Sequence, residues 1–205
     1  MIEAVLLASA LTLNHDLDWR PLRDADGVRS FRVDVDGSSH DAYRADGRVC
    51  ADQMALFALF QNVDGFVTWL PRTESAERIE GGDEFSPLIH VVSDAPWPMR
   101  SRDMVYRITL QTDLEGSSAT VDIEGLPEHI PPRKGRVRLR SASGHWDINL
   151  ADTHADLSFM LHIDVGRIPS ALAARSLHHA VRNAIRNLQK LHPCDPVPPA
   201  VLEEP

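Results

Sequence analysis

The chain has 205 residues, of which 43% are hydrophobic, so it is long enough for one domain with a generous core. Its formal net charge of −9 argues against a nucleic-acid partner, because phosphate binding requires clustered Lys and Arg that this sequence lacks. The same acidity repels anionic lipid headgroups, so any membrane contact is expected to be transient.

An N-terminal arm, residues 1–16, precedes the predicted domain at 17–192. The run IEAVLLASALTL has Ala8 and Ala10 spaced like a signal-peptide cleavage site, but it lacks preceding basic residues and carries Glu3. Two interpretations stay open. A signal remnant would place the protein in the periplasm or outside the cell, whereas an arm packed on the domain fits a cytoplasmic protein. The run is too short to span a bilayer.

The domain is predicted to begin with strands. Residues 19–24 and 28–36 alternate polar and apolar side chains around the turn Asp26-Gly27, which indicates a hairpin. After a second turn at 37–39, residues 41–49 continue the alternation as a third strand.

Helical spacing follows. Asp52 is a candidate N-cap for a helix over 53–62, and a second short helix is predicted over 63–70, where Pro71 ends it.

The strand pattern then returns and completes a sheet of about nine strands. The further strand segments are 73–80, 85–93, 102–112, 118–124, 136–140, 144–150 and 154–164. Within them, Arg136, Arg138 and Arg140 are expected to face solvent, and residues 141–144 are expected to form a hairpin turn. Alternation places one set of apolar residues on the inner face, as candidate ligand contacts: Tyr106, Ile108, Leu110, Val121, Ile123, Trp146, Ile148, Leu157, Phe159 and Leu161.

A long amphipathic helix, residues 168–192, is predicted between Pro169 in its first turn and Pro193 after its end. Its apolar stripe consists of Ala173, Leu177, Ala180, Ala184, Leu188 and Leu191. Its polar side consists of Arg175, Arg182, Arg186, Gln189 and Lys190. We expect this helix to lie across a curved antiparallel sheet, which makes the fold class α+β.

The small residues of the stripe leave two possibilities for the interior. Either the sheet clamps tightly on the helix, or a cavity remains beneath it for an apolar ligand. In the second case Ala173, Leu177, Ala180 and Ala184 contact the ligand from the helix side.

The two cysteines, Cys50 and Cys194, are expected to be unpaired thiols, because they show neither CxxC spacing nor a disulfide framework. The proline-rich tail, residues 193–205, is expected to have no fold of its own.

The ten histidines do not form a predicted metal site, because no HExxH or i, i+4 pair occurs. His154 and His162 are expected in solvent and His90 in the core. Arg102 and Asp103 are interpreted as a structural pair that holds the preceding proline-rich loop.

Several local signatures, in their joint order, resemble the START domain, the lipid-transfer family with a helix-grip fold. They are Trp19 with Asp26-Gly27-Val28, Trp69 after the small helices, Pro96-Trp97-Pro98 with Arg102-Asp103-Met104-Val105, Gly135 with Arg138, Gly144 with Trp146, and Asp164, Gly166 and Ile168-Pro169. The resemblance implies a hydrophobic tunnel that takes up one lipid or sterol-like molecule, with no catalysis and no cofactor. In this arrangement a loop of Pro96, Trp97, Pro98 and Met99 is a candidate gate.

Two alternatives remain. One is an enzyme of the aromatase or cyclase kind on the same scaffold, which requires polar groups that point inward. The other is a groove that binds an apolar peptide or helix. The almost wholly aliphatic and aromatic inner face favours the non-enzymatic lipid binder.

Overall fold

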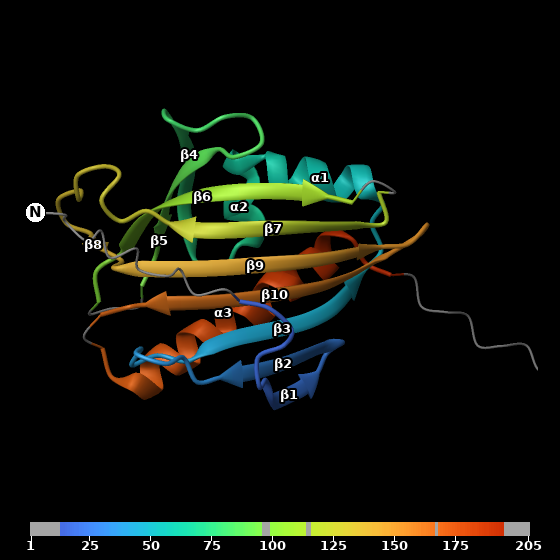
Figure 1. The fold of residues 1–205 in the computed structure, drawn as a ribbon, viewed down its shortest axis with the longest axis horizontal. Coiled ribbons are helices and arrows are strands. Elements are labelled where there is room, and N and C mark those ends of the chain that lie inside the picture. Colours follow the sequence, from blue (N-terminus) through green and yellow to red (C-terminus); the bar gives the residue numbers. More distant parts are fainter. Residues whose placement is uncertain (1–12, 96–98, 114–115, 167, 195–205) are drawn as a thin grey trace, which may run out of the picture.

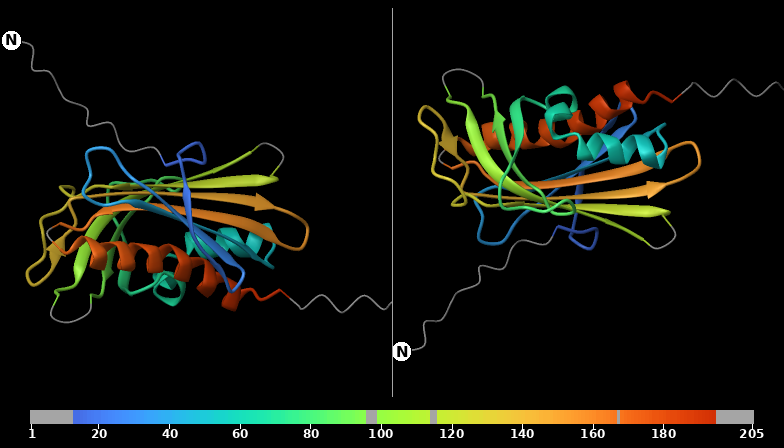
Figure 2. Two further views of the ribbon diagram at one scale, coloured as in Figure 1. Left: turned by 90° about the horizontal axis from the view of Figure 1, so that it is seen from below. Right: turned by 90° about the horizontal axis from the view of Figure 1, so that it is seen from above.

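The computed structural model describes residues 13–95, 99–113, 116–166 and 168–194. All its helices lie on one side of a single curved sheet (Figures 1 and 2). The ten strands are β1 Arg20–Ala25, β2 Val28–Val33, β3 Ala42–Val49, β4 Thr73–Ile79, β5 Leu88–Ser93, β6 Arg102–Thr112, β7 Ser118–Gly125, β8 Val137–Arg138, β9 Ser141–Leu150 and β10 Ala155–Asp164. The helices are α1 Gln53–Gln61, the 3-10 turn Val63–Gly65, α2 Phe66–Trp69 and α3 Ser170–Leu191. The predicted α+β helix-grip fold is confirmed, with ten strands in place of about nine.

The sheet follows the order β1-β2-β3-β10-β9-β7-β6-β5-β4, and β8 pairs with β6 off this path. Its neighbours are antiparallel except for the short parallel pair β6–β8. Because β3 pairs with β10, the first strands of the chain lie beside the last strand, which directly precedes α3.

The two small helices form as predicted. Asp52 is the N-cap of α1 and accepts a hydrogen bond from the Ala55 backbone N–H at 2.8 Å. The second segment divides into the 3-10 turn and α2, whose C-cap Leu70 lies just before Pro71.

The long helix α3 lies very close to β3. Ile185 is fully buried, and a Cβ added at Gly47 would lie only 2.5 Å from its Cγ2 atom. A glycine is therefore required at this position of β3, because any side chain would push the helix away from the sheet. At this point the sheet packs directly against the helix, which is one of the two arrangements expected for the interior.

Three details of α3 differ from the expectation. Pro169 is the N-cap and not the first helical residue. Leu191, assigned to the apolar stripe, is 47% exposed. Arg182, assigned to the polar side, is only 5% exposed; its guanidinium donates to the carbonyls of Val28 at 2.8 Å and Ala25 at 3.0 Å, so it ties α3 to the first hairpin.

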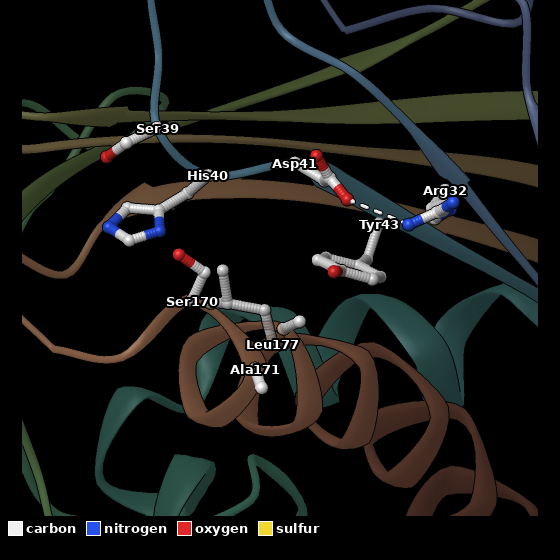
Figure 3. Close-up of a pocket in the computed structure, with 9 residues that line it drawn as sticks. Arg32, Ser39, His40, Asp41, Tyr43, Ser170, Ala171 and Leu177 are labelled. Atoms are coloured by element: carbon white, nitrogen blue, oxygen red, sulfur yellow. Dashed lines mark hydrogen bonds and ion pairs between the residues drawn. The ribbon is translucent and has the colours of Figure 1, made fainter.

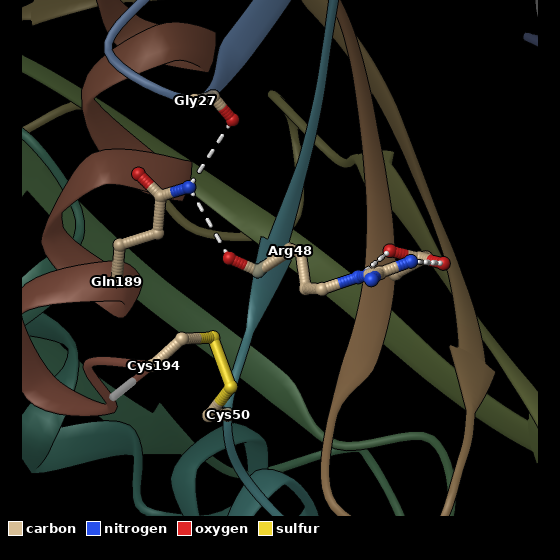
Figure 4. Close-up of a disulfide and its surroundings, with 6 residues drawn as sticks. Gly27, Arg48, Cys50, Gln189 and Cys194 are labelled. Carbon is tan, nitrogen blue, oxygen red and sulfur yellow. Dashed lines mark hydrogen bonds and ion pairs between the residues drawn. A yellow bond between two sulfur atoms is a disulfide. The ribbon is translucent and has the colours of Figure 1, made fainter. Parts of the chain in front are cut away.

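The expectation of two unpaired thiols is wrong, because Cys50 and Cys194 form a disulfide (Figure 4). It links the end of β3 to the residues after α3, where the Cys50 N–H also donates to the His192 carbonyl at 3.2 Å. One turn earlier, the Gln189 side chain donates to the carbonyls of Gly27 and Arg48. The sequence offered no signal for this pairing because 144 residues separate the two cysteines.

The face of the sheet opposite α3 is more covered than predicted. Residues His162 and Arg138 point to this face, as alternation indicates, but neither lies in solvent. His162 is 7% exposed and contacts Ser38 Oγ at 2.9 Å. The Arg138 guanidinium donates to the carbonyls of Pro127 and Ile130 and to Asp103 at 2.7 Å.

His90 is the buried core histidine that was predicted, and it faces away from α3. Its ring nitrogens lie 3.2 Å from Glu77 and 3.1 Å from Asp103. Burial opposes ionisation of Asp103, but hydrogen bonds from Arg138 and His90 hold the pKa of this carboxyl below its usual range. Arg102 does not pair with Asp103. Its guanidinium donates to the Arg100 carbonyl at 2.8 Å, and Asp103 binds Arg138 and His90 instead, so the predicted Arg102–Asp103 pair is wrong.

The expected hairpin turn at residues 141–144 is wrong, because β9 begins at Ser141 and pairs with β10 over this whole stretch. In the arm, Leu13 packs with Val33, Ala42 and Met160 on the face opposite α3. The possible signal remnant and the tail beyond residue 194 lie outside the described residues. Within the described ranges, no helix combines the length and the apolar character needed to cross a membrane.

The close contact between Gly47 and Ile185 predicts that substitutions at these two positions have non-additive effects on the free energy of unfolding. Gly47→Ala should lower the free energy of unfolding by about 1–3 kcal/mol, because the new methyl group overpacks the helix interface. In an Ile185→Ala background the same change should cost far less, because the clashing atom is gone. Urea denaturation of the four proteins measures both costs, and equal costs in the two backgrounds would contradict this packing.

The disulfide predicts a second effect on stability. Replacing Cys50 with Ala and Cys194 with Ser should lower the free energy of unfolding by about 2–4 kcal/mol, because a long loop in the unfolded chain is released. Denaturation with and without dithiothreitol provides the control. The reductant should destabilise the parent protein by a similar amount and leave the double variant unchanged; a parent protein insensitive to the reductant would contradict the pairing.

Candidate functional site

The inner face of the sheet and the helices enclose one continuous apolar cluster. The strand residues predicted to face inward all belong to it. Its buried members include Val121, Trp146, Ile148, Leu157, Phe159 and Leu161. From α3 the cluster includes Leu177, Ala180 and Ala184, whereas Ala173 is buried at 1% exposure beside it. The alternation in the sequence therefore assigned the strand faces correctly.

Aromatic rings fill the centre of this interior. Trp146 of β9 stacks on Phe159 of β10 with ring centroids 4.1 Å apart. Phe60 of α1 and Trp69 of α2 contact Trp146 edge to face. Phe60 and Trp69 were absent from the predicted site because their helices, and not the sheet alternation, bring them inward.

The helix does not cover the sheet evenly. It packs mainly against β3, β10 and β2. Further across the sheet, on β6 and β7, the inward residues Ile108, Leu110 and Ile123 are only partly buried, although they point to the same side as α3. Tyr106 lies beside them, and burial raises the pKa of its hydroxyl. Part of the apolar surface of these inward side chains on β6 and β7 is thus not covered by the core.

A pocket of about 220 Å³ opens at the start of α3 (Figure 3). One wall comes from the first two turns of the helix and the other from β2, β3 and the turn before β3. Its lining residues are Arg32, Ser39, His40, Asp41, Tyr43, Ser170, Ala171, Ala174 and Leu177. Of these, Tyr43, Ala174 and Leu177 also belong to the interior cluster, so the pocket and the interior share one apolar wall.

The polar side chains of this pocket differ in the hydrogen bonds and ion pairs that they form. Arg32 Nη1 lies 3.5 Å from Asp41 Oδ2. Burial, with Asp41 nearby, raises the pKa of Tyr43 to about 12, so this hydroxyl stays protonated at neutral pH. The His40 side chain is 4% exposed, and its Nε2 lies 3.4 Å from the Gly166 carbonyl and 3.8 Å from Asp164. Its Nδ1 has no hydrogen-bond partner among the described residues.

The sequence did not identify this pocket. Only Leu177 of the predicted contact residues lines it. His40 precedes its strand and shows no periodic pattern, so no sequence signal marks it as buried.

A second, shallower hollow of about 590 Å³ lies on the face opposite α3. Arginine–aspartate pairs run along it: Arg44 binds Asp46 with two hydrogen bonds, and Arg48 binds Asp156 in the same way across β3 and β10. Within each pair the charges neutralise each other, so we interpret both pairs as structural, with Arg48–Asp156 linking β3 to β10.

The predicted gate loop lies largely outside the described residues, because Pro96, Trp97 and Pro98 are not described. Met99 is described; it is partly buried, and its sulfur lies 3.7 Å from Arg102 Nη2. Among the described residues, no group of three or more His, Cys, Asp or Glu side chains could hold a metal ion.

No protein-family model matches the chain. An uncharacterized protein of Pseudomonas aeruginosa is 27% identical over 176 residues, covering 84% of this chain and 85% of that protein. The crystal structure of a STAR-related lipid transfer protein from Xanthomonas axonopodis is similar with a TM-score of 0.76 and 27% identity, over 84% of this chain and 97% of that one. The human StarD13 lipid transfer and protein localization domain gives 0.75 at 17% identity, over 90% and 100% of the two chains. Human STARD10 gives 0.72 at 15% identity, over 84% and 71%.

Proposed function

We propose that this chain, which has a START-like fold, binds a single lipid or sterol-like molecule between its sheet and α3, and transfers or presents it. The observation that carries the proposal is the partial exposure of the apolar side chains Ile108, Leu110 and Ile123 on the inner face. The similarity to a bacterial protein named for lipid transfer, at 27% identity over most of both chains, supports the same class of ligand.

Apolar burial alone is sufficient for useful affinity. A ligand that buries about 300 Å² of apolar surface gains about 7 kcal/mol at about 25 cal/mol per Å², before the costs of association. The ligand contacts are the predicted inward residues, and no charged partner in the interior is required.

The proposal includes no catalysis. The inward residues of the described sheet are mainly aliphatic and aromatic. The hydroxyl of Tyr106, one of the polar tips among them, has a raised pKa and stays protonated at neutral pH, so it does not serve as a base.

Entry and location follow from the same proposal. We propose the predicted gate residues 96–99 as the mouth, and we propose that membrane contact is transient because the chain carries a net charge of −9. The Cys50–Cys194 disulfide favours an oxidising compartment, such as the periplasm.

Native mass spectrometry of the protein, purified without detergent from a lipid-containing host, tests the function directly. We expect a population heavier than the chain by the mass of one lipid, which organic extraction removes and which extraction and fragmentation identify. Only the bare chain mass, together with no uptake of fluorescent sterol or fatty-acid analogues, would contradict the proposal.

Two alanines of α3 offer a matched pair for locating the ligand. Ala180 is only partly buried, so Ala180→Leu should extend into the ligand space, keep the melting temperature and weaken binding of a fluorescent analogue. Ala184 is fully buried, so Ala184→Leu should overpack the interface, cost about 1–3 kcal/mol and lower the melting temperature by several degrees.

Thermal melts and analogue titrations of both variants separate these effects. If Ala180→Leu destabilises the fold as much as Ala184→Leu and leaves binding intact, the ligand does not lie along this stretch of the helix.

A further inference from the structure

We infer that the pocket at the start of α3 holds a small anionic head group of the bound molecule, so that the ligand is a single-chain anionic amphiphile. This inference rests on the proposed function and specifies its ligand. It starts from His40, whose side chain is 4% exposed but whose Nδ1 has no partner among the described residues. Figure 3 shows this ring turned toward Ser170 across the pocket.

The surroundings of His40 determine which of its two ring nitrogens is available to a ligand. Its Nε2 faces two acceptors, the Gly166 carbonyl at 3.4 Å and Asp164 Oδ1 at 3.8 Å, so this nitrogen keeps its proton. The second nitrogen, Nδ1, is therefore the free position. In an imidazolium ring both nitrogens are donors, so Nδ1 can give a charge-assisted hydrogen bond to an anion while Nε2 faces Gly166 and Asp164.

The helix supplies the second attraction for an anion. The 22-residue α3 begins at Ser170, and Ser170, Ala171 and Ala174 line the pocket. No acidic residue lies in its first turn, and no described side chain caps it with a hydrogen bond. The positive end of the helix dipole therefore faces the pocket without a counter-charge from the helix itself.

The remaining charges of the pocket do not oppose an anion. Asp41 is its acidic lining residue, and Arg32 lies 3.5 Å from that carboxylate. The lining thus carries no net negative charge, even though the whole chain carries −9.

The size and walls of the pocket define the rest of the ligand. A volume of about 220 Å³ holds about seven water molecules at ~30 Å³ each, which suits a carboxylate or phosphate monoester with a few methylene groups. The apolar wall of Tyr43, Ala174 and Leu177 continues into the interior cluster, so the hydrocarbon chain extends from the pocket toward the sheet.

Displacement of Nile red, an uncharged fluorescent dye, by three compounds of equal chain length provides the test. Dodecanoate and dodecyl phosphate carry the anionic head group, and dodecanol is the neutral reference. We expect at least one anion to displace the dye at a concentration about tenfold lower than dodecanol does, or lower still. The order of the two anions distinguishes a carboxylate from a phosphate ligand.

Two substitutions of His40 separate a ligand contact from a structural role. In His40→Gln the amide reaches the position of Nε2, so the link to Gly166 is kept while the pocket group is lost. In His40→Asn the amide lies near the position of Nδ1, so the pocket group is kept. The preference for the anion should disappear in His40→Gln and be partly retained in His40→Asn, whereas the exposed control His179→Gln should keep it in full.

The possible failures are distinguishable. If Nile red and the three compounds do not bind at all, the proposed function itself is wrong. If the dye binds but dodecanol displaces it as well as the anions do, the proposed function stands and the anionic head group is wrong. The head group is also misplaced if the parent protein prefers the anion and His40→Gln keeps that preference. The displacement order of the three compounds is measured in the parent protein. It therefore tests the anionic head group even if a His40 variant folds poorly.

Discussion

The contact between Ile185 and Gly47 determines where the long helix lies on the sheet. Because β3 has no side chain at position 47, α3 approaches it closely, and Ile185 is fully buried. Two other links hold α3 in the same place: Arg182 binds the carbonyls of Val28 and Ala25, and the Cys50–Cys194 disulfide holds the end of the helix to the end of β3. The helix is thus fixed over one part of the sheet.

This placement decides where a ligand has room. A helix fixed over β3, β10 and β2 leaves inward side chains of β6 and β7 only partly buried. The aromatic layer of Trp146 and Phe159 forms the floor of the interior, and the apolar wall of Tyr43 and Leu177 connects it to the pocket beside His40. The two proposals therefore concern one ligand, with its polar end in the pocket and its hydrocarbon body along the inner face.

Alternation in the sequence was sufficient to predict the sheet and the orientation of its strands. On β10, Phe159 and Leu161 face the helix while His162 faces away, as predicted. An outward direction did not mean exposure, however, because the turn around Ser38 covers His162 and residues 127–138 cover the outer face of β6.

Four of the errors share a physical cause, since they depend on partners in other elements of the fold. Arg138 and Arg182 look like solvent-facing residues in any local pattern, but their guanidinium groups donate to backbone carbonyls and to Asp103 of other elements. The pairing of Cys50 with Cys194 and the burial of His40 likewise follow from the way β3 meets α3, which no local spacing reveals.

The central claim is that α3 stays seated on β3 while a ligand occupies the inner surface of β6 and β7. Methyl NMR spectra of protein labelled at isoleucine, recorded with and without saturating dodecanoate, test this most directly. The signals of Ile108 and Ile123 should shift on binding, whereas that of Ile185, held against Gly47, should remain in place. A shift of Ile185 with Ile108 and Ile123 unchanged would contradict this account.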